Sequence, residues 1–285
     1  MKKFIAFLLV ITTFAHLQAQ REYLPTKADL DHFYETKTYV VLEENQLSDY
    51  NIEITDAVKE FWDITEFEFI KMKDFGSKSE DKNASFLYPA TVSFEKDKSN
   101  TRYTFLCLSL GGNNVTLDEL KDLANMPLSY YGVDSDYYSY KLGTLVRFLQ
   151  NHVRIITADQ SIISQNVYKY YNENIGDLKG KTLYLVEEDL ARDVSSLSKI
   201  KAIYPGKVQI VDRETIKELM MAKDEDAVVL YKVGPEGKKL NARVYKSLVG
   251  VSDAKFYYFD YHKVKGKNPD AFLASDFKKL AKAFK

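Results

Sequence analysis

Cysteine is almost absent from this sequence, and that absence limits how the fold is held together. The 285 residues include one cysteine, Cys107. No internal disulfide can form, so packing alone must stabilise the chain. Cys107 lies in the apolar segment TRYTFLCLSL, whose composition favours a buried strand. Because reactive cysteines need a polar and exposed setting, we expect a buried core thiol.

Long hydrophobic runs are also missing, except at the amino terminus. Residues 1–19 have two lysines directly after Met1, continue with an apolar stretch over residues 4–14 and end at Ala19, which is the layout of a signal peptide. This stretch is shorter than the roughly 20 residues that span a membrane. No cysteine lies near Ala19 to carry a lipid. We therefore predict a bacterial protein that is exported, periplasmic or secreted, with neither a membrane span nor a lipoprotein anchor.

Motifs for catalysis, metals or cofactors are absent from the sequence. It contains no histidine pair at i, i+4, no cysteine cluster and no Gly-x-Ser-x-Gly, and the glycines at Gly111 and Gly112 lack the Lys-Ser or Lys-Thr of a phosphate loop. Its lysines are scattered, which disfavours nucleic acid as a partner. We expect no cofactor and no metal. Whether the protein is an enzyme stays open, with a non-catalytic role favoured.

One short phrase occurs twice in the sequence. Lys37–Glu44 is KTYVVLEE and Lys181–Glu188 is KTLYLVEE, and each apolar run is typical of a strand buried on both faces. A second pair of segments, Ala84–Tyr88 and Ala227–Tyr231, repeats at nearly the same spacing. The repetition in register indicates an internal duplication.

The predicted fold is α/β, with two tandem, duplicated modules of mixed sheet joined by a long helix. Residues 20–175 form the first module and residues 176–285 the second. An apolar stripe over residues 136–174 predicts one long helix or two consecutive ones at the end of the first module. Thr116 and Glu119 form a capping-box pattern that predicts a short helix over Leu117–Ala124.

Charge is divided unequally between the two predicted modules. Residues 20–175 hold 16 basic and 25 acidic residues, whereas residues 176–285 hold 22 basic and 16 acidic residues. Opposite net charges attract. We therefore expect the two modules to dock on each other.

The second predicted module has a pattern of strands and helices that resembles a known envelope domain. Residues VQIVDRETIKELM end a strand, cap a helix with Asp212 and continue amphipathically, and AVVLYKV, a hairpin and a terminal helix follow. Over residues 181–285 this order is similar to the amino-terminal domain of TolB and to the curli-secretion (CsgG-like) proteins. The resemblance implies a non-catalytic envelope module that contacts other proteins, and it supplies no active-site residues.

Two pairs of glutamates follow the repeated strands and are candidate site residues: Glu43, Glu44, Glu187 and Glu188. Ligands of open α/β sheets gather beyond the carboxyl ends of strands. These carboxylates would suit a cation or the acid chemistry of a hydrolase. They are equally typical of solvated strand ends.

A dense tyrosine segment supplies the other candidates: Tyr130, Tyr131, Tyr137 and Tyr138. Exposed tyrosines offer rigid area and a polar tip for a sugar or a peptide. Alternatively they cover the start of the long helix. We predict an exported, non-catalytic envelope protein that acts as a protein-binding or assembly module. The alternatives are an exported hydrolase with acidic residues at strand ends and a carbohydrate-binding protein that uses the tyrosines.

Overall fold

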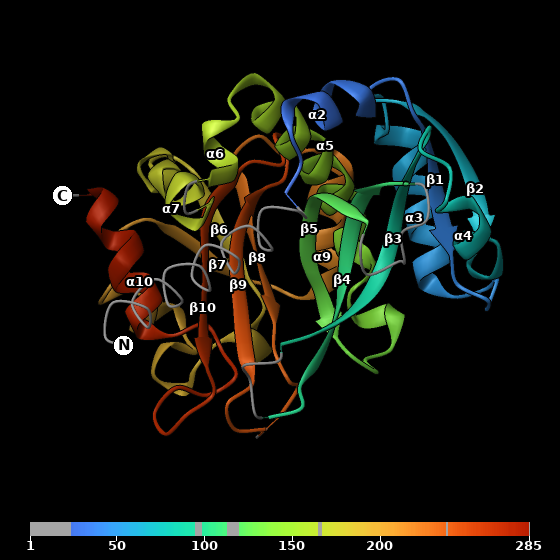
Figure 1. Ribbon diagram of the computed structural model, residues 1–285. Helices are drawn as coiled ribbons and strands as arrows, with labels where there is room; N and C mark the ends of the chain where they lie inside the picture. The colour runs from blue at the N-terminus through green and yellow to red at the C-terminus, as the bar shows by residue number, and fades with distance from the viewer. Residues whose placement is uncertain (1–23, 95–98, 113–119, 165–166, 238, 285) are drawn as a thin grey trace, which may run out of the picture. The chain divides into compact units, whose positions relative to one another are not determined.

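A computed structural model of the chain describes residues 24–94, 99–112, 120–164, 167–237 and 239–284 (Figure 1). The predicted signal peptide, residues 1–19, lies outside the described residues. Among the described helices, none has the length and apolar character needed to cross a bilayer. The mixed helix and strand content confirms the predicted α/β class.

Ten strands are described: β1 Lys37–Leu42, β2 Glu66–Lys71, β3 Ala84–Ser93, β4 Arg102–Leu110, β5 Lys121–Tyr130, β6 Thr182–Leu185, β7 Lys207–Ile210, β8 Ala227–Val233, β9 Arg243–Gly250 and β10 Phe256–Lys263. The described α-helices are α2 Lys27–Phe33, α3 Asp49–Phe61, α4 Met72–Lys78, α5 Leu142–Ala158, α6 Ser161–Ser164, α7 Val167–Asn172, α8 Leu197–Lys201, α9 Arg213–Ala222 and α10 Ala274–Leu280. Short 3-10 turns include η2 Ser135–Tyr137, η3 Ser139–Lys141, η4 Glu173–Leu178 and η5 Glu187–Asp189.

The strands form two five-stranded sheets with the same order. The first runs β2-β1-β3-β4-β5 and the second, read from its other edge, runs β7-β6-β8-β9-β10. In each sheet the second strand in this order is parallel to both of its neighbours. In the second sheet β8, β9 and β10 are antiparallel. This common order agrees with a duplication, which itself stays a prediction.

The repeated phrase is displaced by one residue in the two sheets. Lys37 pairs with Ala84 in the first sheet, whereas Thr182, and not Lys181, pairs with Ala227 in the second. Burial alternates in step with this pairing, so that Thr38 and Leu183 occupy matching buried positions. Because side chains alternate between the faces of a strand, a shift of one residue moves each of them to the opposite face. Aligning KTYVVLEE with KTLYLVEE residue by residue therefore identifies the two equivalent strands, but it places them one residue out of their structural register.

The chain forms two compact units whose segments alternate along the sequence. Of the described residues, the first unit comprises those within 24–44, 63–88 and 107–125, and the second comprises those within 45–62, 89–106 and 126–284. By strand membership, the first sheet falls within the predicted module 20–175 and the second within 176–285. The proposed module boundaries stay a prediction.

Apolar side chains cover both faces of the second sheet. On one face, Leu183, Val228 and Leu248 belong to a buried cluster that also contains Ile200 of α8 and Phe277 of α10. On the other face, α5 and α7 contribute aromatic side chains. Phe148 of α5 stacks on Phe256 at 3.8 Å between ring centroids, and Tyr168 of α7 stacks on Phe259 at 4.9 Å. The second sheet is therefore a central layer between helices.

The first unit has a small core of its own. Phe75 of α4 contacts Phe86 and Tyr88 of β3, with ring centroids 5.0 and 4.7 Å apart. Cys107 is a buried free thiol, and burial raises its pKa, which confirms the expected core thiol. The Thr38 hydroxyl lies 2.7 Å from the Ser85 hydroxyl, so that a buried polar group is satisfied inside the sheet.

Two of the predicted helices differ from the structure. Residues 121–130 form strand β5 beside β4, so the helix predicted over Leu117–Ala124 is wrong where the chain is described, and residues 113–119 lie outside the described residues. The capping-box pattern is local, whereas pairing with β4 is a tertiary interaction that overrides it. The long helix of 136–174 is broken into 3-10 turns and the helices α5, α6 and α7.

His152 of α5 predicts a pH dependence of stability. Its Nδ1 and the Tyr171 hydroxyl form a hydrogen bond of 2.5 Å. Burial lowers the pKa of His152 to about 4. Because the unfolded chain binds the proton more readily, the free energy of unfolding falls as pH drops from about 6.5 toward 4, by up to about 3 kcal/mol.

Urea unfolding of the wild type and of His152→Gln at pH 7 and pH 4.5 measures this contribution. The glutamine keeps an acceptor for Tyr171 and does not titrate, so the variant should lose less stability on acidification than the wild type. Equal losses in the two proteins would show that His152 is not the group that titrates.

Candidate functional site

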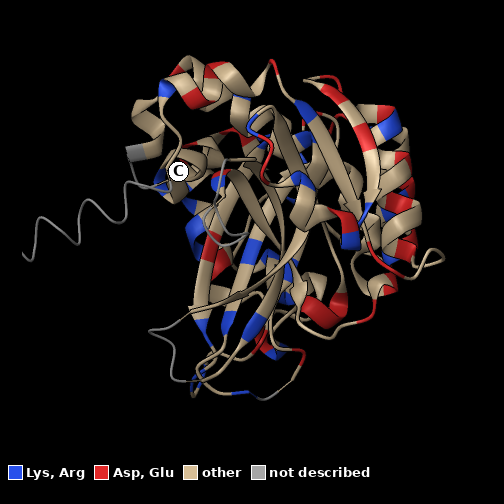
Figure 2. Ribbon diagram, turned by 45° about the vertical axis from the view of Figure 1, so that its right-hand side comes forward, with Lys and Arg blue, Asp and Glu red and all other residues tan. Residues whose placement is uncertain are grey.

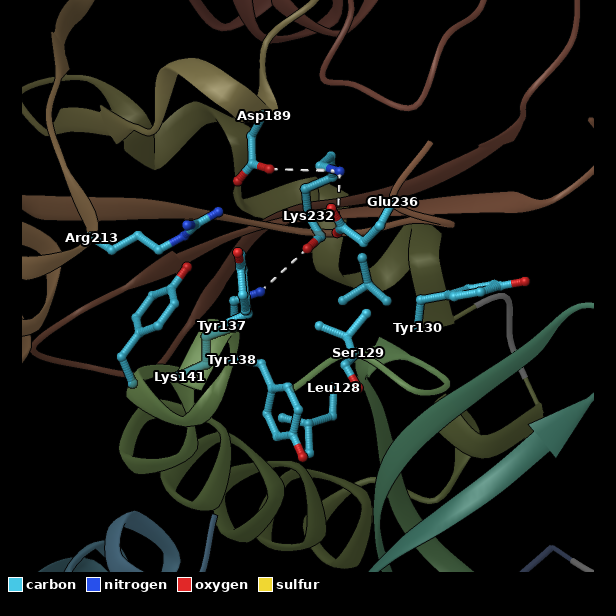
Figure 3. A pocket seen from close by; sticks show the side chains of 13 residues that line it. Leu128, Ser129, Tyr130, Tyr137, Tyr138, Lys141, Asp189, Arg213, Lys232 and Glu236 are labelled. Carbon is cyan, nitrogen blue, oxygen red and sulfur yellow. Dashed lines mark hydrogen bonds and ion pairs between the residues drawn. The ribbon is translucent and has the colours of Figure 1, made fainter. Parts of the chain in front are cut away.

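Three of the four predicted tyrosines border one pocket in the second unit. Tyr130, Tyr137 and Tyr138 line it together with Lys141, Asp189, Arg213, Lys232 and Glu236 (Figure 3). Tyr131 is exposed and is not part of the lining. The structure therefore brings the tyrosine segment together with charged residues from distant parts of the sequence.

The predicted glutamates do not line this pocket. Glu43 and Glu44 follow β1 in the first unit, and Glu187 and Glu188 are exposed at the start of η5 in the second. Glu188 is close enough for its charge to act on Tyr140. The next residue, Asp189, is the buried member of this acidic run and enters the pocket.

Lys232 of β8 lies at the centre of a buried charge network. Its ammonium group is 3.0 Å from Asp270, 3.6 Å from Asp189 and 3.8 Å from Glu236, and Figure 3 shows the lysine between Asp189 and Glu236. Burial would lower the pKa of Lys232, but the three carboxylates together raise it above the usual value. Lys232 is therefore held charged and paired.

Gly234 permits the approach of Asp270 to this network. A Cβ atom at position 234 would lie 1.8 Å from Oδ1 of Asp270. Asp270 also accepts a hydrogen bond from the backbone N–H of Glu236 at 2.9 Å. Because Gly234 has no side chain, the Asp270 carboxylate can bind both the Lys232 ammonium group and the backbone of the turn that follows β8.

Lys141 is the second buried lysine of the pocket, and its surroundings differ. It comes from η3, and its Nζ donates to the backbone oxygen of Lys232 at 3.3 Å. Burial lowers the pKa of Lys141 to about 8, and the positive charge of Lys232 acts in the same direction, while Asp189 opposes it. Lys141 therefore releases its proton more easily than an exposed lysine.

Asp189 faces positive charge on several sides. Burial raises its pKa, although Lys232, Lys141 and Arg213 each lower it. Burial likewise raises the pKa of the Tyr140 hydroxyl, and Asp189 adds to that effect. The interior of the pocket is thus a compact network of alternating charges.

Two exposed tyrosines have arginines over their rings: Tyr137, which lines the pocket, and Tyr131, which follows the lining residue Tyr130 in sequence. We call these two tyrosines and their arginines the tyrosine rim. Tyr137 is 50% exposed, and the Arg213 guanidinium lies 5.2 Å from its ring centroid. Tyr131 is 43% exposed, and Arg102 lies 3.9 Å from its ring. Arginine in such positions is held by the electrostatic attraction of the ring face. One face of each exposed tyrosine is therefore already occupied.

The enclosed space of the pocket is small. Its volume is about 20 Å³, which is enough for about one water molecule. Pockets that enclose small molecules measure about 300–1,000 Å³. The pocket is therefore too small to enclose a ligand. A ligand would bind to the exposed tyrosines around it.

Sequence reasoning identified the tyrosines and missed the lysines. Lys141 carries no local signal of burial, because it is a single charge at the start of an amphipathic segment. The apolar run AVVLYKV, in which Lys232 is the one charge, was the available indication, since a charge inside a strand buried along its length needs a partner.

Comparison with known proteins gave no match among family models, curated proteins or solved structures. Within the described residues, no group of three or more His, Cys, Asp or Glu side chains is arranged to hold a metal ion.

Proposed function

We propose that this protein is an exported, non-catalytic module of a bacterial envelope that binds another protein through the tyrosine rim. The observation that carries the proposal is the pair of exposed Tyr–Arg contacts, Tyr137 with Arg213 and Tyr131 with Arg102. Tyrosine and arginine dominate the binding energy of protein interfaces. The resemblance to TolB and curli-secretion domains supports the same class of function.

A rigid support makes these side chains suitable for binding. Arg213 begins α9 directly after the N-cap Asp212, whose carboxylate accepts from the Thr215 N–H at 2.8 Å. Tyr137 ends η2, close to the buried Lys141 and Asp189. Because little side-chain freedom remains to be lost, binding at this rim costs less entropy than at a mobile loop.

Carbohydrate binding by the same tyrosines is a weaker proposal. A sugar stacks on an open aromatic face, and one face of both Tyr131 and Tyr137 is covered by a guanidinium. A hydrolase using Glu43, Glu44, Glu187 and Glu188 finds no support in their placement, because they lie outside the pocket. Export, the envelope partner and docking of the two modules remain proposals.

A photo-crosslinking amino acid in place of Tyr137, expressed in cells that make the protein, tests the proposal. We expect it to capture one protein partner, because the ring lines the pocket and is half exposed. The matched control replaces Tyr261, which is 41% exposed, lies 5.4 Å from Arg243 and is not part of the pocket. Equal capture at both positions would argue against a specific site.

A further inference from the structure

The two edge strands of the second sheet, β10 and β7, differ in whether side chains are hydrogen-bonded to their outer backbone groups. At β10, the side chain of Asn172 accepts from the N–H of Phe259 at 2.7 Å and donates to its carbonyl at 2.9 Å. Asn174 donates to the carbonyl of Phe256 at 2.7 Å. These amides replace a neighbouring strand, so the β10 edge is closed to further pairing.

The opposite edge, β7, has no such cover. The N–H of Val211 donates to Leu185 of β6, and backbone groups alternate in direction along a strand. The N–H and C=O groups of Val208 and Ile210 therefore point away from the sheet. Within the part of the chain that is described, no side chain is hydrogen-bonded to the backbone of β7. This edge is open to an added strand.

A basic groove follows the open edge. It has a volume of about 400 Å³ and is lined by the first three residues of β7, by Thr182 of β6, and by Lys201, Pro205 and Gly206 from the preceding helix and turn. Lys201 and Lys207 are the charged residues of its lining, and both are exposed. No acidic residue lines the groove. Its charge favours an extended segment that carries carboxylates.

The matching edge of the first sheet is acidic. β2 is the outer strand of its sheet, beside β1 (Figure 1), and alternates exposed Glu66 and Glu68 with half-buried Phe67 and Phe69. In the strand order it holds the place that β7 holds in the second sheet. Figure 2 colours every described Asp and Glu red and every described Lys and Arg blue. Glu68 forms an exposed ion pair with Lys37 at 2.6 Å, whereas no ion pair of Glu66 is recorded within the described residues.

The two edges carry opposite charge at the same structural position. Glu66 pairs with Lys37, the first residue of β1, and Lys207 pairs with Thr182, the first residue of β6. The strand order places these two pairs in corresponding places. The acidic edge therefore has the charge, the extended form and the alternating side chains that the basic groove requires.

We propose that β2 of one molecule adds to β7 of a second copy of the chain, with Glu66 and Glu68 facing Lys207 and Lys201. Backbone hydrogen bonds give the contact its affinity, and the charges select the partner edge. Each copy carries one edge of each kind, so the contact is heterologous and propagates into a ring or a filament. This assembly is independent of the tyrosine rim.

Light scattering coupled to size exclusion, applied to the full chain over a range of concentrations, tests the proposal. The wild type should assemble in a concentration-dependent way. An acidic-edge variant, Glu66→Lys with Glu68→Gln, and a basic-edge variant, Lys207→Glu with Lys201→Gln, should each raise the dissociation constant by at least about tenfold. The exposed control Glu218→Lys, on α9, should assemble as the wild type does.

Mixing the two edge variants gives the sharpest result. The first keeps an intact β7 and the second an intact β2, and the altered β2 of the first is again opposite in charge to the altered β7 of the second. Neither variant should assemble alone, whereas the mixture should recover assembly with the two variants in alternation. A chain carrying all four substitutions should assemble again, because the charges are complementary once more. A monomeric wild type, or assembly unaffected by both edge variants, would overturn the proposal, as would a monomer whose β7 takes only an unrelated acidic peptide. The crosslinking experiment at Tyr137 does not depend on assembly. A negative result for the β2–β7 contact therefore leaves the proposed protein binding at the tyrosine rim unaffected.

Discussion

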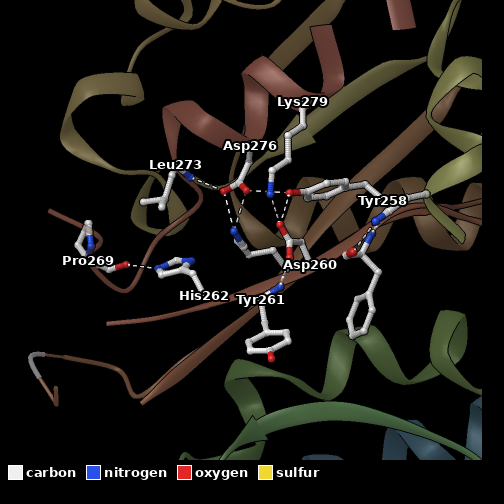
Figure 4. Close-up of polar contacts among 11 residues, drawn as sticks. Tyr258, Asp260, Tyr261, His262, Pro269, Leu273, Asp276 and Lys279 are labelled. Carbon is white, nitrogen blue, oxygen red and sulfur yellow. Dashed lines mark hydrogen bonds and ion pairs between the residues drawn. The ribbon is translucent and has the colours of Figure 1, made fainter. Parts of the chain in front are cut away.

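Replacing Asp276 by alanine should reduce the free energy of unfolding by about 3–5 kcal/mol. Asp276 of α10 holds the Lys246 ammonium with both oxygens, at 2.7 and 2.8 Å (Figure 4). Both side chains are almost fully buried, with 2% and 1% exposed. Burial lowers the pKa of Lys246, and Asp276 counteracts it. The variant leaves a buried cation without its carboxylate.

Other polar groups depend on the same carboxylate. The Tyr258 hydroxyl lies 2.8 Å from Oδ1 of Asp276 and 3.0 Å from Oδ2 of Asp260, and its one proton can serve only one of them at a time. The Leu273 N–H donates to Oδ2 of Asp276 at 2.8 Å. Asp276 thus joins the start of the last helix to the sheet, and its loss should release α10.

Urea unfolding of a double-mutant cycle measures this pair. Lys246→Met combined with Asp276→Ala removes both charges and should be more stable than Asp276→Ala alone. The helix should also become open to protease in the single variant. A loss below about 1 kcal/mol for Asp276→Ala would contradict the assigned role.

Lys232→Met should also cost about 3–5 kcal/mol, whereas Lys141→Met should change stability by less than about 1 kcal/mol. Lys232 neutralises Asp270 and Asp189, whose side chains are 7% and 12% exposed. Lys141 donates to a carbonyl at 3.3 Å and is repelled by Lys232. Two buried lysines in one pocket are therefore expected to behave in opposite ways.

Thermal and urea unfolding of the two methionine variants checks this contrast. The substitution keeps the apolar length of the side chain, so packing is conserved and charge is the variable. Equal losses would contradict this contrast, and would mean that Asp189, on which both lysines act, depends on Lys141 as much as on Lys232.

Regular apolar runs made most of the strands predictable. AVVLYKV and KFYYFDYHKV contain β8 and β10, and VQIVDRETIKELM contains most of β7 and most of α9. Asp212 was predicted as the N-cap of α9 and accepts from Thr215. Local chemistry of this kind survives in the fold because tertiary contacts agree with it.

Non-local features could not be predicted in the same way. The strand at Lys121–Tyr130 depends on β4, and the register of the repeated phrase depends on β3 and β8. The tyrosine segment was predicted as a candidate, but Arg213 and Asp189 join it only through the fold. A charge pattern in one dimension does not reveal which charges become buried together.

The dissociation constant of the partner captured at residue 137 tests the proposed function most directly. For Tyr137→Ala and Arg213→Ala we predict a rise of about 30-fold or more, the loss expected at a central interface residue. Tyr261→Ala should bind within about twofold of the wild type, since surface changes outside an interface cost little. An unchanged constant for Tyr137→Ala and Arg213→Ala, in variants that remain folded, would contradict the assignment of the rim as the binding site.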